Sequence, residues 1–442
     1  MKRYEAYKDS GVDWIGEIPE GWDVLPGLSF IYENKEKNKG MVRNTVLSLS
    51  YGKIRVKAEN ELTGLVPESF ETYQLVNVGD LIFRPTDLQN DMVSLRSSIS
   101  QYEGIITSAY LNLRFKENAN PNFFHYFFRS IDNNKIIYGL GSGLRQNISY
   151  LDFRRFLFPF PPLFEQTAIA QFLGDKTAKI DQTIGIRQKE IELLKERRQI
   201  LIQQAVTGKW SMVNGEWSKT PAEKLKPSGV DWIGEIPERW EVRKLKYCLS
   251  SKLKYGANES GVEYDLDLPR YIRITDFGFD GKLSEEKKLS LTWQQGKDYL
   301  LKDGDILFAR SGATVGKSYQ FKTSMSFEKH YSFAGYLIKA EANEEIILSD
   351  YLYLYTNSNL FDNWKSAIFN KATIENIGAD KYSTLSVVVP PVKEQEEILL
   401  EYNSKNEKIA KAITLKEQEI EKLKEYKTVL IDNVVTGKVK IN

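Results

Sequence analysis

Two nearly identical segments, GVDWIGEIPEGW (11–22) and GVDWIGEIPERW (229–240), constrain the fold of this chain more than any other feature of its sequence. Gly21 in the first copy corresponds to Arg239 in the second, and all other positions are identical. We call these ranges the first and second opening segments. A repeat of this kind indicates that one structural unit occurs twice, and we interpret it as one task that the protein performs twice.

A second repeated block closes each half of the chain. It contains an Asn-Ile pair, a Pro-Pro pair followed two residues later by Glu-Gln, and the ending VTGK, at a constant offset of 229 residues. Its copies are Asn147-Ile148 with 161–166 and 206–209, and Asn376-Ile377 with 390–395 and 435–438. The intervening stretches, 25–146 and 243–375, share little beyond GDLIFR (79–84) and GDILFAR (304–310). This pattern predicts a common scaffold that presents two different recognition surfaces.

The length of 442 residues exceeds what one ordinary hydrophobic core covers, so at least two domains are expected. The repeats divide the chain into an N-terminal repeated segment (1–24), a first recognition domain (25–160), a central long helix (161–209), a linker (210–228), a second recognition domain (229–389) and a C-terminal long helix (390–442). The recognition domains are expected to be mixed α/β. Short apolar runs predict strands within 44–56, 108–115, 270–277 and 335–340, and aromatic-rich stretches predict helices within 121–131 and 348–366.

The residues after each Pro-Pro pair predict a helix of about 45 residues, which would span nearly 70 Å. Gly208 and Gly437 follow these stretches where a C-terminal cap is expected. Apolar residues recur at heptad spacing in both copies, which is typical of a two-helix coiled coil. The predicted seam comprises Ile180, Ile184, Ile191, Leu194 and Leu201 of the first helix and Ile409, Ile413, Ile420, Leu423 and Leu430 of the second.

Basic residues at four seam positions decide the orientation of this helix pair. A parallel, in-register pair would set Arg187 against Lys416 and Arg198 against Lys427, and buried like charges are costly. A centred antiparallel pair sets each of them against an isoleucine, so that aliphatic stems lie on the seam and charges reach water. The sequence therefore predicts an α/β (α+β) protein with two globular domains joined by two long antiparallel coiled-coil helices in a pseudo-two-fold repeat.

Sequence signals of catalysis are weak. His125 and His330 lack metal-ligand companions, and the single cysteine, Cys248, is interpreted as a buried apolar residue. The stretch SGATVGKS (311–318) begins with serine where a phosphate-binding loop needs glycine, and we interpret it as a turn between strands. The N-terminus lacks an apolar signal region and no stretch predicts a membrane span, so we expect a cytoplasmic protein without catalytic, cofactor or metal residues.

These features together resemble the specificity (S) subunit of Type I restriction–modification enzymes. The resemblance rests on both opening segments, GDILFARSGATVGKS (304–318), Gln-Asn-Ile at 146–148, both Pro-Pro-x-x-Glu-Gln motifs and both VTGK endings. One departure is Glu375, which stands where the first half has Gln146. A second is that the first opening segment lacks the basic continuation that follows the second.

The resemblance implies a non-catalytic subunit that reads a bipartite, asymmetric double-stranded DNA target, with one target recognition domain for each half-site. The long helices would space the two domains and bind two modification subunits, which methylate adenine with S-adenosylmethionine. Restriction subunits, which use ATP and magnesium, would complete the complex for defence against foreign DNA. The alternative is a bivalent scaffold that binds two proteins and no DNA.

Basic residues in predicted loops are the candidate DNA contacts, because arginine and lysine bind base edges and phosphates. A net charge of +1 gives no direct indication of such a role. The candidates are Arg84, Arg96 and Arg145 in the first domain, and Arg310, Lys317 and Lys371 in the second.

Overall fold

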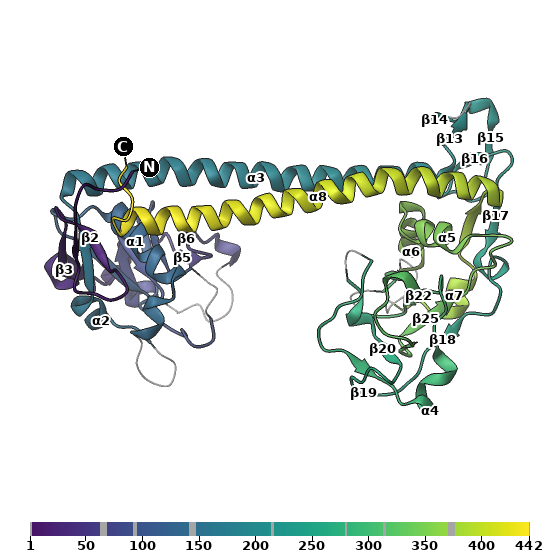
Figure 1. Ribbon diagram of the computed structural model, residues 1–442, viewed down its shortest axis with the longest axis horizontal. Coiled ribbons are helices and arrows are strands. Elements are labelled where there is room, and N and C mark those ends of the chain that lie inside the picture. Colours follow the sequence, from purple (N-terminus) through teal and green to yellow (C-terminus); the bar gives the residue numbers. More distant parts are fainter. Residues whose placement is uncertain are drawn as a thin grey trace. The chain divides into compact units, whose positions relative to one another are not determined.

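The structure, a computed structural model of the full chain, describes residues 2–61, 69–91, 95–140, 147–213, 216–278, 281–312, 315–369 and 376–441. It divides into two compact units, which are residues 1–189 with 416–442 (unit 1) and residues 190–415 (unit 2). Each unit holds one opening segment, most of one predicted recognition domain and a part of both long helices (Figure 1).

Unit 1 consists of short strands and two short helices packed on the two long helices. Its elements are β1 (Tyr7–Asp9), β2 (Glu17–Pro19), β3 (Asp23–Pro26), β4 (Ile31–Glu33), β5 (Leu47–Ser50), β6 (Lys53–Val56), β7 (Gln74–Val76), β8 (Leu81–Phe83), β9 (Ser97–Ile99), β10 (Gly104–Ile106), β11 (Leu111–Phe115), α1 (Pro121–Asn133), α2 (Tyr150–Arg155), β12 (Leu157–Phe160) and the first part of α3 (Leu163–Thr207).

Unit 2 begins within α3 and is richer in strands. Its elements are β13 (Trp210–Val213), β14 (Glu216–Lys219), β15 (Leu225–Pro227), β16 (Glu235–Pro237), β17 (Glu241–Lys244), β18 (Lys254–Tyr255), β19 (Val262–Glu263), β20 (Arg270–Ile272), β21 (Leu289–Ser290), α4 (Trp293–Gly296), β22 (Ile306–Ala309), β23 (Ser318–Gln320), β24 (Tyr331–Phe333), β25 (Leu337–Ala340), α5 (Ser349–Thr356), α6 (Asn359–Phe369), α7 (Ala379–Ser383), β26 (Ser386–Val389) and the first part of α8 (Val392–Val435).

A four-stranded antiparallel sheet of the same topology lies in both units, although the two stretches share little sequence. Its order is β4-β11-β8-β9 in unit 1 and β18-β25-β22-β23 in unit 2. A buried aspartate precedes the equivalent strands β8 and β22, and each pairs with a cation of the neighbouring strand: Asp80 with Arg114 at 2.9 Å, and Asp305 with Lys339 at 3.0 Å. The recognition domains therefore differ in what surrounds this sheet. Unit 1 adds the pairs β5-β6 and β10-β7, and unit 2 adds the sheet β19-β21-β20-β24.

The two long helices run antiparallel, as the sequence predicts. In unit 1, Lys427 of α8 pairs with Asp181 of α3 at 2.7 Å, and Arg187 of α3 pairs with Glu419 of α8 at 2.8 Å. Both pairs fit the centred register. The charged ends of these two basic residues bind carboxylates on the opposite helix, whereas the sequence predicted that they reach water. Six of the ten predicted seam residues are buried, namely Ile180, Ile191, Ile409, Ile413, Ile420 and Leu430, and the other four are half-buried.

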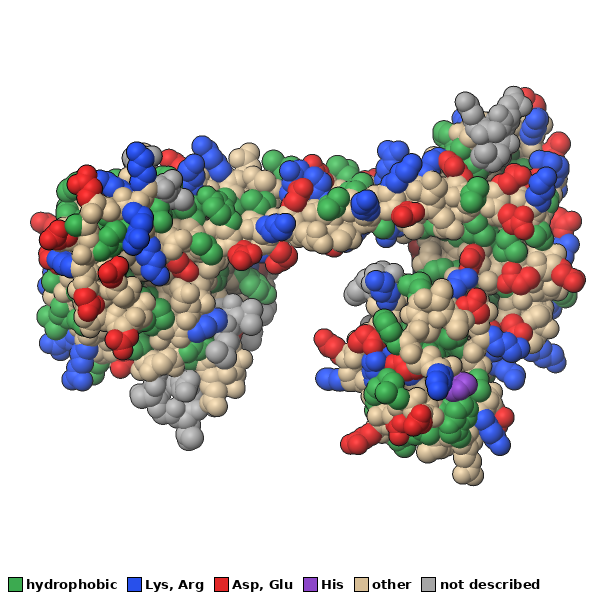
Figure 2. Space-filling model, in the orientation of Figure 1, with side chains coloured by type: hydrophobic (Ala, Val, Ile, Leu, Met, Phe, Trp, Pro, Cys, Tyr) green, Lys and Arg blue, Asp and Glu red, His purple; other side chains and the backbone are tan. Residues whose placement is uncertain are grey.

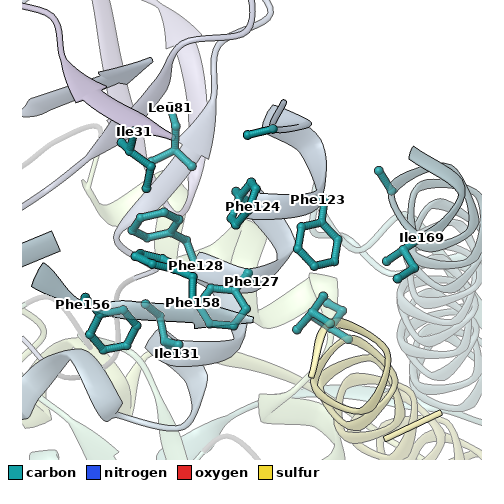
Figure 3. Close-up of a cluster of buried hydrophobic side chains, with 14 of the residues drawn as sticks. Ile31, Leu81, Phe123, Phe124, Phe127, Phe128, Ile131, Phe156, Phe158 and Ile169 are labelled. Carbon is teal, nitrogen blue, oxygen red and sulfur yellow. The ribbon is translucent and has the colours of Figure 1, made fainter. Parts of the chain in front are cut away.

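A phenylalanine-rich core joins the recognition domain of unit 1 to its helices. Figure 3 shows Phe124, Phe127 and Phe128 of α1 beside the strands, while Phe123 points toward Ile169 of α3. The same core includes Leu430 and Val434 of α8, and most of its side chains are fully buried. Because burial of large apolar side chains is the main stabilising contribution to folding, this continuous core fixes the domain of unit 1 on both helices within that unit.

Candidate nucleic-acid interface

Each opening segment packs against the start of one long helix and the end of the other. In unit 1, Trp22 is buried and its Nε1 donates to Glu165 Oε2 of α3 at 3.0 Å. Gly437 follows α8 with a φ of 75°, and a Cβ on it would lie within 3.2 Å of the Trp22 ring. In this unit, the segment therefore binds the first turn of α3 and the last turn of α8.

Unit 2 repeats this arrangement with the roles of the two helices exchanged. Trp240 Nε1 donates to Glu394 Oε2 of α8 at 2.8 Å, and Gly208, which follows α3 with a φ of 64°, lies against Trp240. The positive φ of both glycines agrees with the predicted C-terminal caps. The Glu of each Pro-Pro-x-x-Glu-Gln motif thus accepts a hydrogen bond from the tryptophan of an opening segment. This contact was not predicted from the sequence, and the only signal for it was that both motifs occur twice.

The Gln of each motif connects the long helix to a helix of the recognition domain. Gln166 is buried, accepts from the backbone N–H of Asn120 at 2.7 Å and donates to the carbonyl of Pro161 at 2.8 Å. Gln395 is buried in the same way, accepts from Leu348 N at 2.8 Å and donates to Pro390 O at 2.8 Å. Because Asn120 and Leu348 directly precede α1 and α5, these amides set how each domain joins its helix.

The repeated Asn-Ile pair lies beside the chain that leaves the equivalent strands β8 and β22. Ile148 N donates to Pro85 O at 2.9 Å, and Ile377 N donates to Arg310 O at 2.9 Å. The asparagine side chains accept from the same connections, Asn147 from Asp87 N and Asn376 from Arg310 Nε, both at 3.3 Å. The isoleucine therefore braces this connection by the same backbone hydrogen bond in both units, while the asparagine bond comes from a backbone donor in unit 1 and a side-chain donor in unit 2.

Four of the sequence-predicted DNA contacts occupy the two ends of this connection. Arg84 and Arg96 flank the β8–β9 connection, and Arg310 and Lys317 flank the β22–β23 connection. Ser97 pairs with Phe83 and Ser318 with Phe308, so Arg96 and Lys317 hold equivalent positions. Arg145 and Lys371 lie outside the residues that the structure describes, in the stretches that precede the Asn-Ile pairs.

Arg96 is buried and turned inward. Its guanidinium donates to the carbonyls of Thr86 at 2.7 Å and Asp87 at 3.1 Å, and to that of Asp91, all within the β8–β9 connection. This arrangement argues against the predicted role of Arg96 as a DNA contact and makes it the residue that holds the connection in shape. Sequence alone could not distinguish it from Arg84, since both arginines stand at a strand end.

The other three described candidates, Arg84, Arg310 and Lys317, have partners within the protein and are still partly exposed. Arg84 pairs with Asp91 at 2.8 Å with a third of its side chain exposed. The Arg310 guanidinium lies 5.2 Å from the centre of the Tyr255 ring, a cation–π contact that the sequence did not predict. Lys317 donates to Phe277 O at 2.7 Å, and partial burial lowers its pKa. Arg84, Arg310 and Lys317 stay predicted DNA contacts.

The two histidines and the single cysteine pack against aromatic or apolar neighbours. Burial, with smaller effects of Arg129 and Lys427, lowers the pKa of His125 to about 3, and His330 packs edge-on against Trp293. Burial raises the pKa of Cys248 to about 11. Within the ranges described above, no cluster of His, Cys, Asp and Glu could hold a metal ion. Likewise, no helix in those ranges is both long and apolar enough to cross a membrane.

Charged side chains of both signs lie intermingled on the molecular face that Figure 2 shows. This distribution matches the sequence balance of 61 Lys and Arg against 60 Asp and Glu. Recognition of an anionic partner would therefore depend on individual loops more than on one broad basic surface on this face.

Known proteins that resemble this chain over most of its length share one description. This chain is 22% identical to the Type I restriction enzyme StySPI specificity subunit of Salmonella potsdam, and the match covers 87% of this chain and 82% of that subunit. It is 23% identical to the MjaVIII specificity subunit of Methanocaldococcus jannaschii (96% and 94% covered) and 24% identical to the EcoKI specificity subunit of Escherichia coli (87% and 82%). No protein-family model matches the sequence.

A solved structure with the same fold is described as "Structural basis underlying complex assembly and conformational transition of the type I R-M system". It superposes with a TM-score of 0.69 at 15% identity, over 96% of this chain and 99% of the other. The predicted fold class is thereby confirmed. Repeated motifs, high coverage of several relatives and a shared fold agree: over most of its length the chain is similar to specificity subunits of Type I restriction enzymes.

Proposed function

We propose that this chain recognises a bipartite, asymmetric DNA target for a Type I restriction–modification complex, with one half-site read by each unit. The observation that carries this proposal is the shared four-stranded sheet, whose β8–β9 and β22–β23 connections are braced alike but differ in sequence. One sheet with two different sets of loops suits two different half-sites. Bases are read by side chains such as those of Arg84 and Arg310, which border these connections.

The test compares one arginine of each unit in cells that also produce the modification subunits. Arg84→Ala should weaken methylation through the first half-site, and Arg310→Ala through the second, each by about tenfold because one base contact contributes about 1–3 kcal/mol. Arg243→Ala is the matched control, since this residue lies on β17 and pairs with Glu241. Sequencing of methylated adenines reads both half-sites at once. Equal loss through both half-sites in either variant would contradict the proposal.

The proposal includes a scaffold for two modification subunits, supported by exposed apolar residues that recur on both helices. Ile186 and its equivalent Leu415 are each 51% exposed, and Ile200 and its equivalent Val429 are 49% and 48% exposed. These pairs stand 14 residues apart on each helix, a heptad multiple outside the α3–α8 seam. Large apolar side chains at heptad spacing on an open helix face suit the docking of a partner helix.

Because the pattern occurs on each long helix, two copies of one partner should bind. Native mass spectrometry should give two modification subunits for one copy of this chain. Ile200→Glu and Val429→Glu should each lower that occupancy without unfolding the chain, and unchanged occupancy in both variants would refute this part of the proposal. If the chain were instead a bivalent protein adaptor, the assembled complex would bind no target DNA.

A further inference from the structure

Unit 1 contains a cleft of about 980 Å³ between its recognition domain and the long helices. The β5–β6 hairpin, α1, α3 and the last part of α8 form its walls, and Figure 1 shows these elements together. Its lining includes Tyr51 and Lys53 of the hairpin, His125 and Arg129 of α1, and Lys424 of α8. All of these residues belong to unit 1.

Arg129 is a largely buried cation in this cleft without a carboxylate partner among the described residues. Its guanidinium donates one hydrogen bond, from Nη2 to the carbonyl of Gly52 at the hairpin turn. The nearby acids are engaged elsewhere, because Asp181 binds Lys427 at 2.7 Å and Asp132 accepts from Arg96 N at 2.8 Å. Burial lowers the pKa of Arg129, and the nearby negative charges of Asp132 and Asp181 offset only part of that effect.

His125 lies one turn before Arg129 on the same helix and adds an unused polar atom. Its Nδ1 is buried and has no hydrogen-bond partner in the described structure. The imidazole is neutral at physiological pH, because burial, together with Arg129 and Lys427, lowers its pKa to about 3. A neutral imidazole with its proton on Nδ1 can donate one hydrogen bond to an anion.

An anion with several oxygens would satisfy both groups. A phosphate ester accepts paired hydrogen bonds from a guanidinium and one more from the imidazole, and it removes the cost of an unpaired buried cation. The exposed Lys53 adds positive charge at the rim, and so does Lys424, whose ammonium also pairs with Glu421 at 2.8 Å. Aromatic surface is also available, since Tyr51 is 91% exposed and Tyr102 is 45% exposed along the same cleft, and nucleic-acid bases stack on such rings.

We propose that this cleft binds the phosphate of a nucleotide, with Arg129 and His125 as its ligands, Lys53 and Lys424 at its rim and a base against the tyrosines. The phosphate has two possible sources with the same chemistry, a free mononucleotide or the backbone of bound DNA. The DNA source rests on the proposed function and the free-nucleotide source does not. In both cases the site belongs to unit 1, and its proposed ligands lie outside the β8–β9 connection that we assign to base reading, although Leu95 of that connection lines the same cleft.

The test titrates the full chain with AMP, adenosine and inorganic phosphate by calorimetry. If the source is a free nucleotide, AMP binds one-to-one and at least about tenfold more tightly than adenosine, as expected for lost charge-assisted hydrogen bonds. Arg129→Gln and His125→Phe should each weaken AMP binding. The double variant Lys53→Gln/Lys424→Gln should also weaken AMP binding, and it should leave the fold intact because both positions are exposed. Lys39→Gln, at another exposed position of unit 1, is the matched control.

The same variants are titrated with target duplex in the complex with modification subunits. If the source is DNA, the Lys53→Gln/Lys424→Gln chain binds every sequence more weakly, with a smaller salt dependence and an unchanged methylation motif, since phosphate contacts carry no sequence information. AMP binding in a chain that binds no DNA would support the cleft and refute the proposed function. If the lysine pair behaves like Lys39→Gln with both AMP and DNA, the cleft is not a phosphate site.

Discussion

One glutamate organises each opening segment, and the single difference between the two segments compensates for a change outside them. Glu165 accepts from Trp22 on one oxygen and from Tyr4 on the other, and burial together with Glu165 raises the pKa of Tyr4, so its hydroxyl stays a donor. At the position equivalent to Tyr4 the second half has Ala222, and there Arg239 pairs with Glu394 at 2.8 Å. The exchange of Gly21 for Arg239 therefore supplies the missing donor.

This compensation predicts a rescue. Tyr4→Phe removes one hydrogen bond to a carboxylate and should lower the free energy of unfolding of unit 1 by about 1–2 kcal/mol. Adding Gly21→Arg should restore part of it, up to about 1 kcal/mol, because an exposed ion pair contributes little and a Cβ at Gly21 meets no atom within 4 Å. Urea unfolding midpoints measure both effects. A Gly21→Arg gain of equal size in the presence of Tyr4 would contradict the compensation.

The arginines mark the limit of what the sequence reveals at this scale. The sequence placed Arg84, Arg96, Arg310 and Lys317 in predicted loops, yet it gave no sign that Arg96 turns inward. That direction depends on Asp132 of α1, which accepts from Arg96 N, and on carbonyls that meet only after the chain folds. Buried polar networks of this kind leave no periodic pattern in the sequence.

The helices were the most predictable elements. Heptad spacing predicted their extent. The four basic residues at seam positions predicted their antiparallel register, because a parallel pair would bury like charges against each other. The recognition domains were only partly predictable. Individual strands such as β11 and β25 were expected, but the shared sheet was not, since pairing between distant strands is set by tertiary contacts and not by local sequence.

Glycines within and after α3 give a test of the helix ends. Gly208 has a φ of 64°, and a Cβ there would lie 2.9 Å from Trp240, so Gly208→Ala should destabilise unit 2 by about 1–3 kcal/mol. Gly174 lies inside the helix, and the only atom within 4 Å of a Cβ there is Tyr126 Oη at 3.9 Å. Gly174→Ala is therefore the matched control and should stabilise unit 1 by up to about 1 kcal/mol. Thermal unfolding of the two variants measures both signs, and a neutral Gly208→Ala would show that the second opening segment does not bind this helix end.

At the scale of the whole molecule, the exchanged roles of the two helices explain why the opening segment must occur twice. Each segment binds the first turn of its own half's helix and the last turn of the helix from the other half. Neither half of the sequence can complete this arrangement alone. Two copies of one half could, because the VTGK ending of α3 is equivalent to that of α8.

A chain ending at residue 219 should therefore form a dimer in which each first opening segment binds the Gly208 end of its partner's helix. With modification subunits present, this dimer should methylate a palindrome of the first half-site. Light scattering gives the mass and methylation sequencing gives the motif. A monomeric fragment, or a dimer that methylates the asymmetric target of the full chain, would contradict the equivalence of the two helix ends.

The most direct test of the central claim is a map of methylated adenines in a methylation-free host that produces this chain with its modification subunits. Two readers on one repeated scaffold predict a motif of two short, different half-sites at a fixed distance, with unread base pairs between them. Arg310→Ala should then relax one half-site and leave the other unchanged. A single continuous motif, or methylation whose sequence does not depend on this chain, would contradict the account.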